Sequence, residues 1–334
     1  MTAKLTRFVD LTVNQLQSWK TLYDREPLAC PETSPDYVRS MITDKHSEHN
    51  VIVWHDRDSF AAFTLHNDTL RAVAPKHPVL NGGKNPVTLM DVCSSIRHHG
   101  YNAYFPLVDE SYIDSWHDEN TMFWKRRNNF VIDVVKSDKS SFQRALERGS
   151  KQILRKRSQL ENRGYNLYVA ENVEYEIDNM LKIDNHSWKA MRRQSMTQRH
   201  QDVMYSKLLK SRFARITFLR YQDEPIAFRL DVHHNRLVTC LKWSFDERHA
   251  KVSPGMYLLT TALDLEYGDG NFDLIDLHGG PDNLKKLVCT HEEHRIDLWH
   301  GNLQSGEIIR MERLAFDAHA AKILQSGKGL RHGY

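Results

Sequence analysis

The sequence predicts an α/β (α+β) protein with two mixed, mostly antiparallel sheets, each flanked by helices. Three observations lead to this prediction. Strand-like and helix-like segments follow one another in the same order twice along the chain. Apolar residues recur with the helical period in the longer segments and alternate in the shorter ones. The length of 334 residues is sufficient for two domains of ordinary size.

The second half of the chain carries the clearer pattern. An alternating strand is expected at 166–170, a helix from Val173 to about Arg193, and a second helix at 202–210. Three strand-like runs separated by polar turns then predict an antiparallel meander, with strands at 215–221, 225–232 and 236–245. Ser253-Pro254-Gly255 opens an apolar helix that ends at Gly268 or Gly270. A strand at 272–277, a glycine-rich corner, a short helix near Leu284 and a closing strand at 294–299 complete the order.

The first half repeats this order more faintly. Its helices are expected at 13–23, 36–42, 87–96 and 112–116, and its strands at 8–9, 51–54, 59–65, 70–73, 103–108 and 130–135. The strand at 130–135 would close the first half. A polar segment follows it, and Ser140 or Ser141 can cap the next helix, so we place the boundary between the halves near residue 138.

Composition excludes several classes of protein. With 40% hydrophobic and 27% charged residues, the chain resembles a globular protein and not a disordered one. The four cysteines, Cys30, Cys93, Cys240 and Cys289, are scattered, which predicts reduced thiols and no zinc site. The chain starts without an apolar signal segment, and no run approaches the roughly 20 apolar residues of a membrane span. We therefore expect a soluble, cytoplasmic protein.

One histidine pattern and one glycine pattern resemble known motifs but lack the required spacing. His291-Glu292-Glu293-His294 has the wrong spacing for a zinc helix, so no metal is expected. Asn81-Gly82-Gly83-Lys84 lacks the spacing of a phosphate loop and is interpreted as a turn.

Four stretches of the second half carry a family resemblance. They are the basic segment 149–165, Ile183 to Lys189, the turn Ser253 to Leu259 and the corner Asp276 to Lys285. Together with the order of elements, they resemble the GNAT-like acetyltransferases of CelD type, whose wider relatives are the Fem-type aminoacyl-tRNA-dependent transferases. The resemblance covers roughly residues 140–300. The corner departs from the family pattern by having leucine where the family often has tyrosine.

The resemblance implies a tandem GNAT-like fold. Residues 1–138 would form an N-terminal half that shapes the acceptor pocket or has a structural role. Residues 139–334 would form an N-acyltransferase domain of the GNAT superfamily.

A GNAT-like fold places the acyl donor where the fourth strand and the following helix diverge. Lys242, Trp243 and Ser244 would line the donor's arm, and Ser253, Gly255 and Met256 would approach its phosphates at the helix N-terminus. The implied co-substrate is acyl-CoA or an acyl-phosphopantetheine. This loop lacks the family's "Q/R-x-x-G-x-G/A" pattern, which leaves open an acyl carrier protein, a tRNA, or a simple helix cap without a ligand.

Acyl transfer to an amine requires a neutral nucleophile and a polarised carbonyl. We expect Asp276, His278 and Lys285 to be catalytic, because the corner places a carboxylate, an imidazole and an ammonium group together. The alternative is a structural ion pair between Asp276 and Lys285, and most of the nineteen histidines must be incidental. The candidates for substrate binding are Asp184, His186, Trp188 and Asp231.

The charge distribution favours a phosphate-rich partner or a solvated helix face. Residues 124–165 hold twelve Lys or Arg against four Asp or Glu. Three functions stay open: acyl transfer from a thioester to a small-molecule amine, aminoacyl transfer from tRNA, and non-catalytic binding. The sequence identifies neither the acceptor nor the oligomeric state.

Overall fold

The computed structural model describes residues 3–27, 29–74, 77–82, 87–110, 116, 118–125, 131–136, 139–149, 151–211, 213–278 and 283–325. Contacts divide the chain into two compact units. The first unit comprises residues 1–132 and 293–334, and the second unit comprises residues 133–292. Residues 112–115 of the predicted helix at 112–116 and residues 83–84 of the predicted turn at 81–84 lie outside the described residues.

The sheet of the first unit is mixed. Four antiparallel strands come first: β1 (Lys4–Arg7), β2 (Val51–His55), β3 (Ser59–His66) and β4 (Thr69–Ala72). The sheet continues with a parallel pairing of β4 to β6 (Asn102–Asp109) and then with antiparallel β14 (His291–His300) and β7 (Thr121–Trp124). The short β5 (Leu80–Asn81) pairs with β3.

Local capping chemistry sets where the helices of this unit begin. Thr12 and Thr88 each close a capping box, at the starts of α1 (Val13–Arg25) and α4 (Leu89–His98). The remaining helices are α2 (Pro35–Met41), α3 (Lys45–Asn50) and α12 (Leu303–Gln325). The buried face of α4 packs with β3, β4 and β6 in a core that includes Val92, Phe63 and Phe105.

The sheet of the second unit repeats the same pattern of pairing. The four antiparallel strands are β9 (Tyr165–Val169), β10 (Ala214–Tyr221), β11 (Glu224–His234) and β12 (Leu237–Phe245). They are followed by β13 (Leu274–Asp276), parallel to β12, and by β8 (Val131–Lys136), antiparallel to β13. In both units one long helix connects the fourth strand to its parallel neighbour. The predicted class, two mixed sheets flanked by helices, is therefore confirmed.

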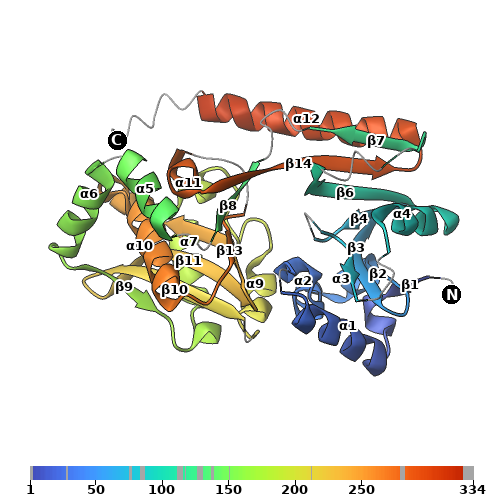
Figure 1. The fold of residues 1–334 in the computed structure, drawn as a ribbon, viewed down its shortest axis with the longest axis horizontal. Coiled ribbons are helices and arrows are strands. Elements are labelled where there is room, and N and C mark those ends of the chain that lie inside the picture. Colours follow the sequence, from blue (N-terminus) through green and yellow to red (C-terminus); the bar gives the residue numbers. More distant parts are fainter. Residues whose placement is uncertain are drawn as a thin grey trace. The chain divides into compact units, whose positions relative to one another are not determined.

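In the second unit that connecting helix is α10 (Pro254–Asp269), which lies against β10, β11 and β12 (Figure 1). The other helices are α5 (Lys139–Gly149), α6 (Lys151–Glu161), α7 (Ile177–Asn185), α8 (Trp188–Met191), α9 (Asp202–Leu208) and α11 (Asn283–Val288). The single helix predicted from Val173 to Arg193 is wrong. It is divided into a 3-10 turn, α7 and α8, because Ser187 caps α8 and interrupts the helix.

The two closing strands do not pair in the order expected from the sequence. The strand predicted to close the first half, β8, pairs with β13 of the second unit, and β14 pairs with β6 of the first. Alternation predicts that a segment is a strand but does not encode its partner, so the order along the chain suggested the wrong sheet. The unit boundaries consequently differ from the predicted division into 1–138 and 139–334: residues 293–334 belong with the first unit.

No helix among the described residues is both long and apolar enough to cross a membrane.

Candidate active site

Strands β12 and β13 separate soon after they meet. They pair only over Leu237–Thr239 and Leu274–Asp276, whereas β12 continues to Phe245. Among the described strands, none pairs with residues 240–245 on the side that β13 leaves. The backbone of β12 therefore presents a free edge at this point.

A β-bulge in β12 lies where this free edge begins. Leu230 of β11 faces Lys242, and the next residue, Asp231, faces Cys240, so Leu241 is the additional residue. Adjacent strand residues point to opposite faces, and paired residues share a face. The bulge therefore directs Lys242 and Cys240 to opposite faces of the sheet, although they are two residues apart.

Lys242 belongs to a buried polar group on the α7 face of the sheet. Its ammonium group lies 3.4 Å from the carboxylate of Asp184, which is fully buried in α7 and also accepts a hydrogen bond of 2.6 Å from the backbone N–H of Met196. The ammonium group also lies 5.5 Å from the centre of the Tyr205 ring. Burial lowers the pKa of Lys242 and Asp184 opposes this effect. Asp184, which the sequence predicts to bind substrate, thus pairs with the ammonium group of Lys242 and accepts a hydrogen bond from the loop before α9.

Lys189 of α8 reaches the free edge of β12. Its Nζ donates a hydrogen bond of 2.5 Å to the carbonyl of Trp243, its one hydrogen bond among the described residues. Burial, and then the nearby Lys242, lower the pKa of Lys189 to about 8, while Asp184 opposes the shift. An ammonium group has three N–H donors, so Lys189 keeps two for another acceptor.

At the predicted catalytic corner, two side chains bind the backbone of His278. The carboxylate of Asp276 accepts a hydrogen bond of 2.8 Å from the backbone N–H of His278, and Lys285 of α11 donates one of 2.6 Å to the His278 carbonyl. His278 has φ +47°, in the left-handed region. Lys285 therefore binds the carbonyl of His278. The alternative to a catalytic role was an ion pair between Lys285 and Asp276.

The start of α10 has the expected helix-initiating residues. Ser253 occupies the N-cap position with φ +54° and makes no side-chain cap, and Pro254 is the first helical residue. A Cβ on Gly255 would lie 3.2 Å from the ring of Phe245, which is closer than most such contacts, so the ring would have to shift slightly. Met256 packs against the apolar core beneath α10. The glycine at this position therefore relieves a close contact with Phe245.

A second polar group lies on the α10 face of the sheet. The guanidinium group of Arg229, fully buried, donates from Nε to Asp231 at 2.8 Å. Neither Nη atom of Arg229 has a hydrogen-bond partner among the described residues. The thiol of Cys240 lies beside this guanidinium group, yet burial raises the pKa of Cys240 to about 12.

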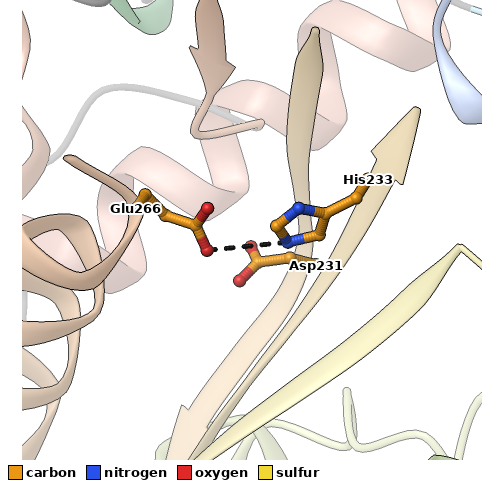
Figure 2. Close-up of side chains that lie close together, drawn as sticks. All are labelled: Asp231, His233 and Glu266. Carbon is orange, nitrogen blue, oxygen red and sulfur yellow. Dashed lines mark ion pairs between the residues drawn. The ribbon is translucent and has the colours of Figure 1, made fainter. Parts of the chain in front are cut away.

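Figure 2 shows Asp231 and His233 of β11 converging with Glu266 of α10. The potential ligand atoms lie within 4.8 Å of one another, and burial, with Asp231 nearby, raises the pKa of Glu266 to about 7. Arg229 and Arg215, the latter 3.2 Å from Glu266, already compensate these carboxylates. Two arginines thus supply positive charge to these carboxylates where α10 packs on β11.

The remaining predicted residues lie near the free edge without forming one constellation. His186 is exposed, and its ring Nδ1 lies 2.8 Å from the carbonyl of Lys182. Trp188 is partly buried beneath the guanidinium group of Arg192, 5.0 Å from the ring centre. Trp243 packs against the core beneath α10, and Ser244 is buried with its hydroxyl lacking a hydrogen-bond partner among the described residues.

Two residues of this region were missed by sequence reasoning. Arg229 interrupts the apolar run Ile226–Leu230, and a charge within such a run was the available signal. Lys189 ends the stretch Ile183 to Lys189, one of the four that carry the family resemblance, but its approach to β12 depends on the break between α7 and α8. The bulge at Leu241 has no signature in the sequence.

Part of the second unit matches a known protein family. Residues 147–286 match the family model of the acetyltransferase (GNAT) domain. The predicted resemblance to GNAT-like acetyltransferases is therefore confirmed, and residues 147–286 of the second unit are similar to an acetyltransferase (GNAT) domain. No curated protein matches the chain at a significant level.

Three solved structures share the fold over most of the chain. The C-terminal domain of a protein described as a lysylphosphatidylglycerol synthetase from Agrobacterium fabrum is 12% identical, with 88% of this chain and 94% of that chain covered and a TM-score of 0.64. L-PGS from Bacillus licheniformis is 12% identical, with 87% and 99% covered and a TM-score of 0.58. FemX is 8% identical, with 92% and 99% covered and a TM-score of 0.62. At these identities the likeness shows a common fold.

Proposed function

We propose that the chain transfers an acyl group from an activated carrier to the amine of a small-molecule acceptor. The observation that carries the proposal is the free, bulged edge of β12 at residues 240–245, which begins where the parallel pairing with β13 ends. The catalytic corner after β13 lies at this same divergence. The family match at 147–286 supports acyl transfer as the class of reaction.

The chemistry assigned to the free edge is polarisation of the acyl carbonyl. The bulge leaves its additional residue, Leu241, out of the register with β11, and we assign the backbone N–H groups of this segment to the donor's carbonyl oxygen. Such donors stabilise the negative charge that develops on the carbonyl oxygen during attack. An acyl-CoA or acyl-phosphopantetheine would supply the thioester, with its amide arm along residues 242–244.

The corner would handle the proton of the acceptor. The amine nitrogen bonds to the acyl carbon while the carbonyl–sulfur bond breaks, and we assign to the imidazole of His278 the removal of the amine proton and its delivery to the leaving sulfur. Asp276 and Lys285 hold the backbone of His278 on both sides, through its N–H and its carbonyl. They are therefore assigned as the residues that keep the imidazole in place.

A second candidate is aminoacyl transfer from tRNA. It is favoured by the shared fold with FemX and with a protein named for making lysylphosphatidylglycerol. The basic helix α6, where Arg155 is exposed, supplies charge for a nucleic acid.

The test compares donors with the full-length protein. Acyl-CoAs, an acyl-loaded carrier protein and aminoacyl-tRNAs are each incubated with a mixture of amines, and mass spectrometry detects the acylated product. We expect turnover with a thioester donor, lost in His278→Ala and Lys285→Met and retained in Lys286→Met, an exposed neighbour on the same helix.

Two results would change the assignment. Product formed only with aminoacyl-tRNA, under steep salt dependence, would establish the second candidate. Binding of a donor without turnover in any combination would indicate a non-catalytic binding protein.

A further inference from the structure

Lys189 places an amine at the free edge of β12. Its Nζ lies 2.5 Å from the carbonyl oxygen of Trp243, to which it donates a hydrogen bond. The charges of Lys242 and Cys240 both act on this ammonium group. Because the bulge directs those two side chains to opposite faces of the sheet, a group close to both lies at the edge of the strand. The amine of Lys189 is therefore beside Leu241, the residue that the bulge adds.

Lys189 differs from two neighbouring lysines in having no carboxylate as its partner. Lys242 forms an ion pair with Asp184 at 3.4 Å, and Lys182, an exposed lysine of α7, forms one with Glu224 at 2.9 Å. Within the described part of the chain, Lys189 forms no ion pair, and its hydrogen-bond acceptor is a neutral carbonyl. A lysine without a paired anion loses its proton more readily when it is buried.

The surroundings of Lys189 favour its neutral, nucleophilic form. Burial, and then the nearby ammonium group of Lys242, lower the pKa of Lys189 to about 8. Asp184 and Cys240 oppose this shift, and Lys285 adds to it. About half of the Lys189 side chains are then neutral at pH 8, against about one in 300 for a lysine at the ordinary value of 10.5. Burial beside a second cation is one of the ways in which proteins activate a lysine as a nucleophile.

We infer that Lys189 is itself acylated by the donor that binds along the free edge of β12. The inference rests on the proposed acyl transfer, which assigns the thioester carbonyl to Leu241 and the donor's arm to residues 242–244. A strand advances about 3.3 Å per residue, so Leu241 and Trp243 lie about 7 Å apart along β12. The flexible four-carbon stem of Lys189 covers that distance by changing its rotamer.

The reaction forms an amide and releases a thiol. The lone pair of the neutral Nζ attacks the carbonyl carbon, while the backbone N–H groups assigned at Leu241 stabilise the negative charge on the oxygen. The carbon–sulfur bond then breaks with its electron pair on sulfur, and the proton that leaves Nζ passes to that sulfur. An amide is far less reactive than a thioester, so the acyl group stays on Lys189. Acylation is thus a modification of the site and not an intermediate of the transfer.

Acylation would change the free edge in two ways. It removes the positive charge of Lys189 and leaves a single N–H in place of three donors. It also places the acyl group against residues 241–243, where the next donor would bind. Transfer should therefore slow as the modified fraction grows, and it should slow most when the donor is present without an acceptor amine.

The test is peptide mapping of the full-length protein by mass spectrometry after incubation with acyl-CoAs and with an acyl-loaded carrier protein, in the absence of an acceptor. The reference is Lys286, an exposed lysine of α11. We expect Lys189 to be acylated at least about tenfold faster than Lys286 at pH 8, because about half of its amine is neutral and it lies beside the bound thioester. The rate at Lys189 should level off above about pH 9, where its amine is almost fully neutral.

Trace acetic anhydride separates reactivity from binding, since this reagent needs no donor site. The preference for Lys189 over Lys286 should be larger with the thioesters than with the anhydride. Lys189→Arg keeps a cation at the edge but has no amine to acylate. During prolonged incubation with donor, turnover by the wild type should decline in proportion to the acylated fraction of Lys189, and turnover by Lys189→Arg should not decline.

Three outcomes would overturn the inference: Lys189 stays unmodified with every thioester, it is acylated no faster than Lys286, or the thioesters favour it no more than acetic anhydride does. The proposed function can fail separately. Acylation of Lys189 without turnover of any amine would contradict the proposed function and leave this inference intact. Turnover of amines while Lys189 stays unmodified would do the opposite.

Discussion

Replacing Lys189 by methionine should stabilise the protein at pH 7 and lose that advantage at pH 10. Burial, with Lys242 nearby, lowers the pKa of Lys189 from 10.5 to about 8. Each unit corresponds to about 1.4 kcal/mol, so keeping this lysine charged in the folded protein costs about 3–4 kcal/mol. Loss of the hydrogen bond to Trp243 offsets about 1 kcal/mol of the gain.

The sign follows from proton binding in the two states. Between pH 8 and 10.5 the unfolded chain holds a proton on Lys189 that the folded protein lacks, so wild-type stability rises with pH in this window. Below pH 8 both states are protonated, and the folded state carries the whole penalty. Lys189→Met should therefore be more stable by about 2–3 kcal/mol at pH 7 and no more stable than wild type at pH 10.

The assay is urea denaturation of both proteins at the two pH values, and the quantity of interest is their difference. Titration of other groups cancels in that difference. Lys182→Met, whose side chain is exposed, serves as the control and should change stability by less than about 0.5 kcal/mol at either pH. A variant that is less stable than wild type by the same amount at pH 7 and pH 10 would refute the reasoning.

Three further predictions concern the scaffold. Asp184→Asn should lower the free energy of unfolding by about 3 kcal/mol, because it leaves a buried lysine without its anion; urea midpoints test this, and an unchanged midpoint would contradict it. Gly301→Ala should cost at least about 2 kcal/mol, since φ is +144° and its Cβ would lie 2.2 Å from Oδ1 of Asn102; Gly268→Ala, with open space around it in α10, should be neutral or stabilising by up to about 1 kcal/mol. Residues 133–292 expressed alone should fold cooperatively, as judged by circular dichroism and amide exchange, whereas a fragment cut at residue 138 should not form either complete sheet.

Local signals were sufficient for most elements of the second unit. Polar residues at 222–224 and 234–235 mark both turns of the meander, and the observed strands β10 to β12 agree with the expected runs to within two residues. Pro254 and Gly270 bound α10, as a first-turn proline and a left-handed C-cap glycine do. These features depend only on neighbouring residues, so a single sequence contains them.

Features that depend on distant partners were not predictable in the same way. The alternation of β14 shows that it is a strand, but its pairing with β6 joins Arg295 to Asp109, far apart in the chain. The approach of Lys189 to the Trp243 carbonyl likewise requires the bulge at Leu241 and the interruption before α8. The sequence places Asp276, His278 and Lys285 at one corner, where Asp276 and Lys285 bind the backbone of His278, and their catalytic role stays a prediction.

The exchange of closing strands has a consequence during protein synthesis. The sheet of the first unit needs β14, at residues 291–300, and the second unit, 133–292, is translated before it. A nascent chain therefore holds an incomplete first sheet, with β6 unpaired on one side, until β14 has left the ribosome. The contiguous second unit can complete its folding first, since all its strands are translated by then. Slow or interrupted translation near residue 290 would leave the edge of β6 exposed to aggregation, and chaperones would be needed at that stage.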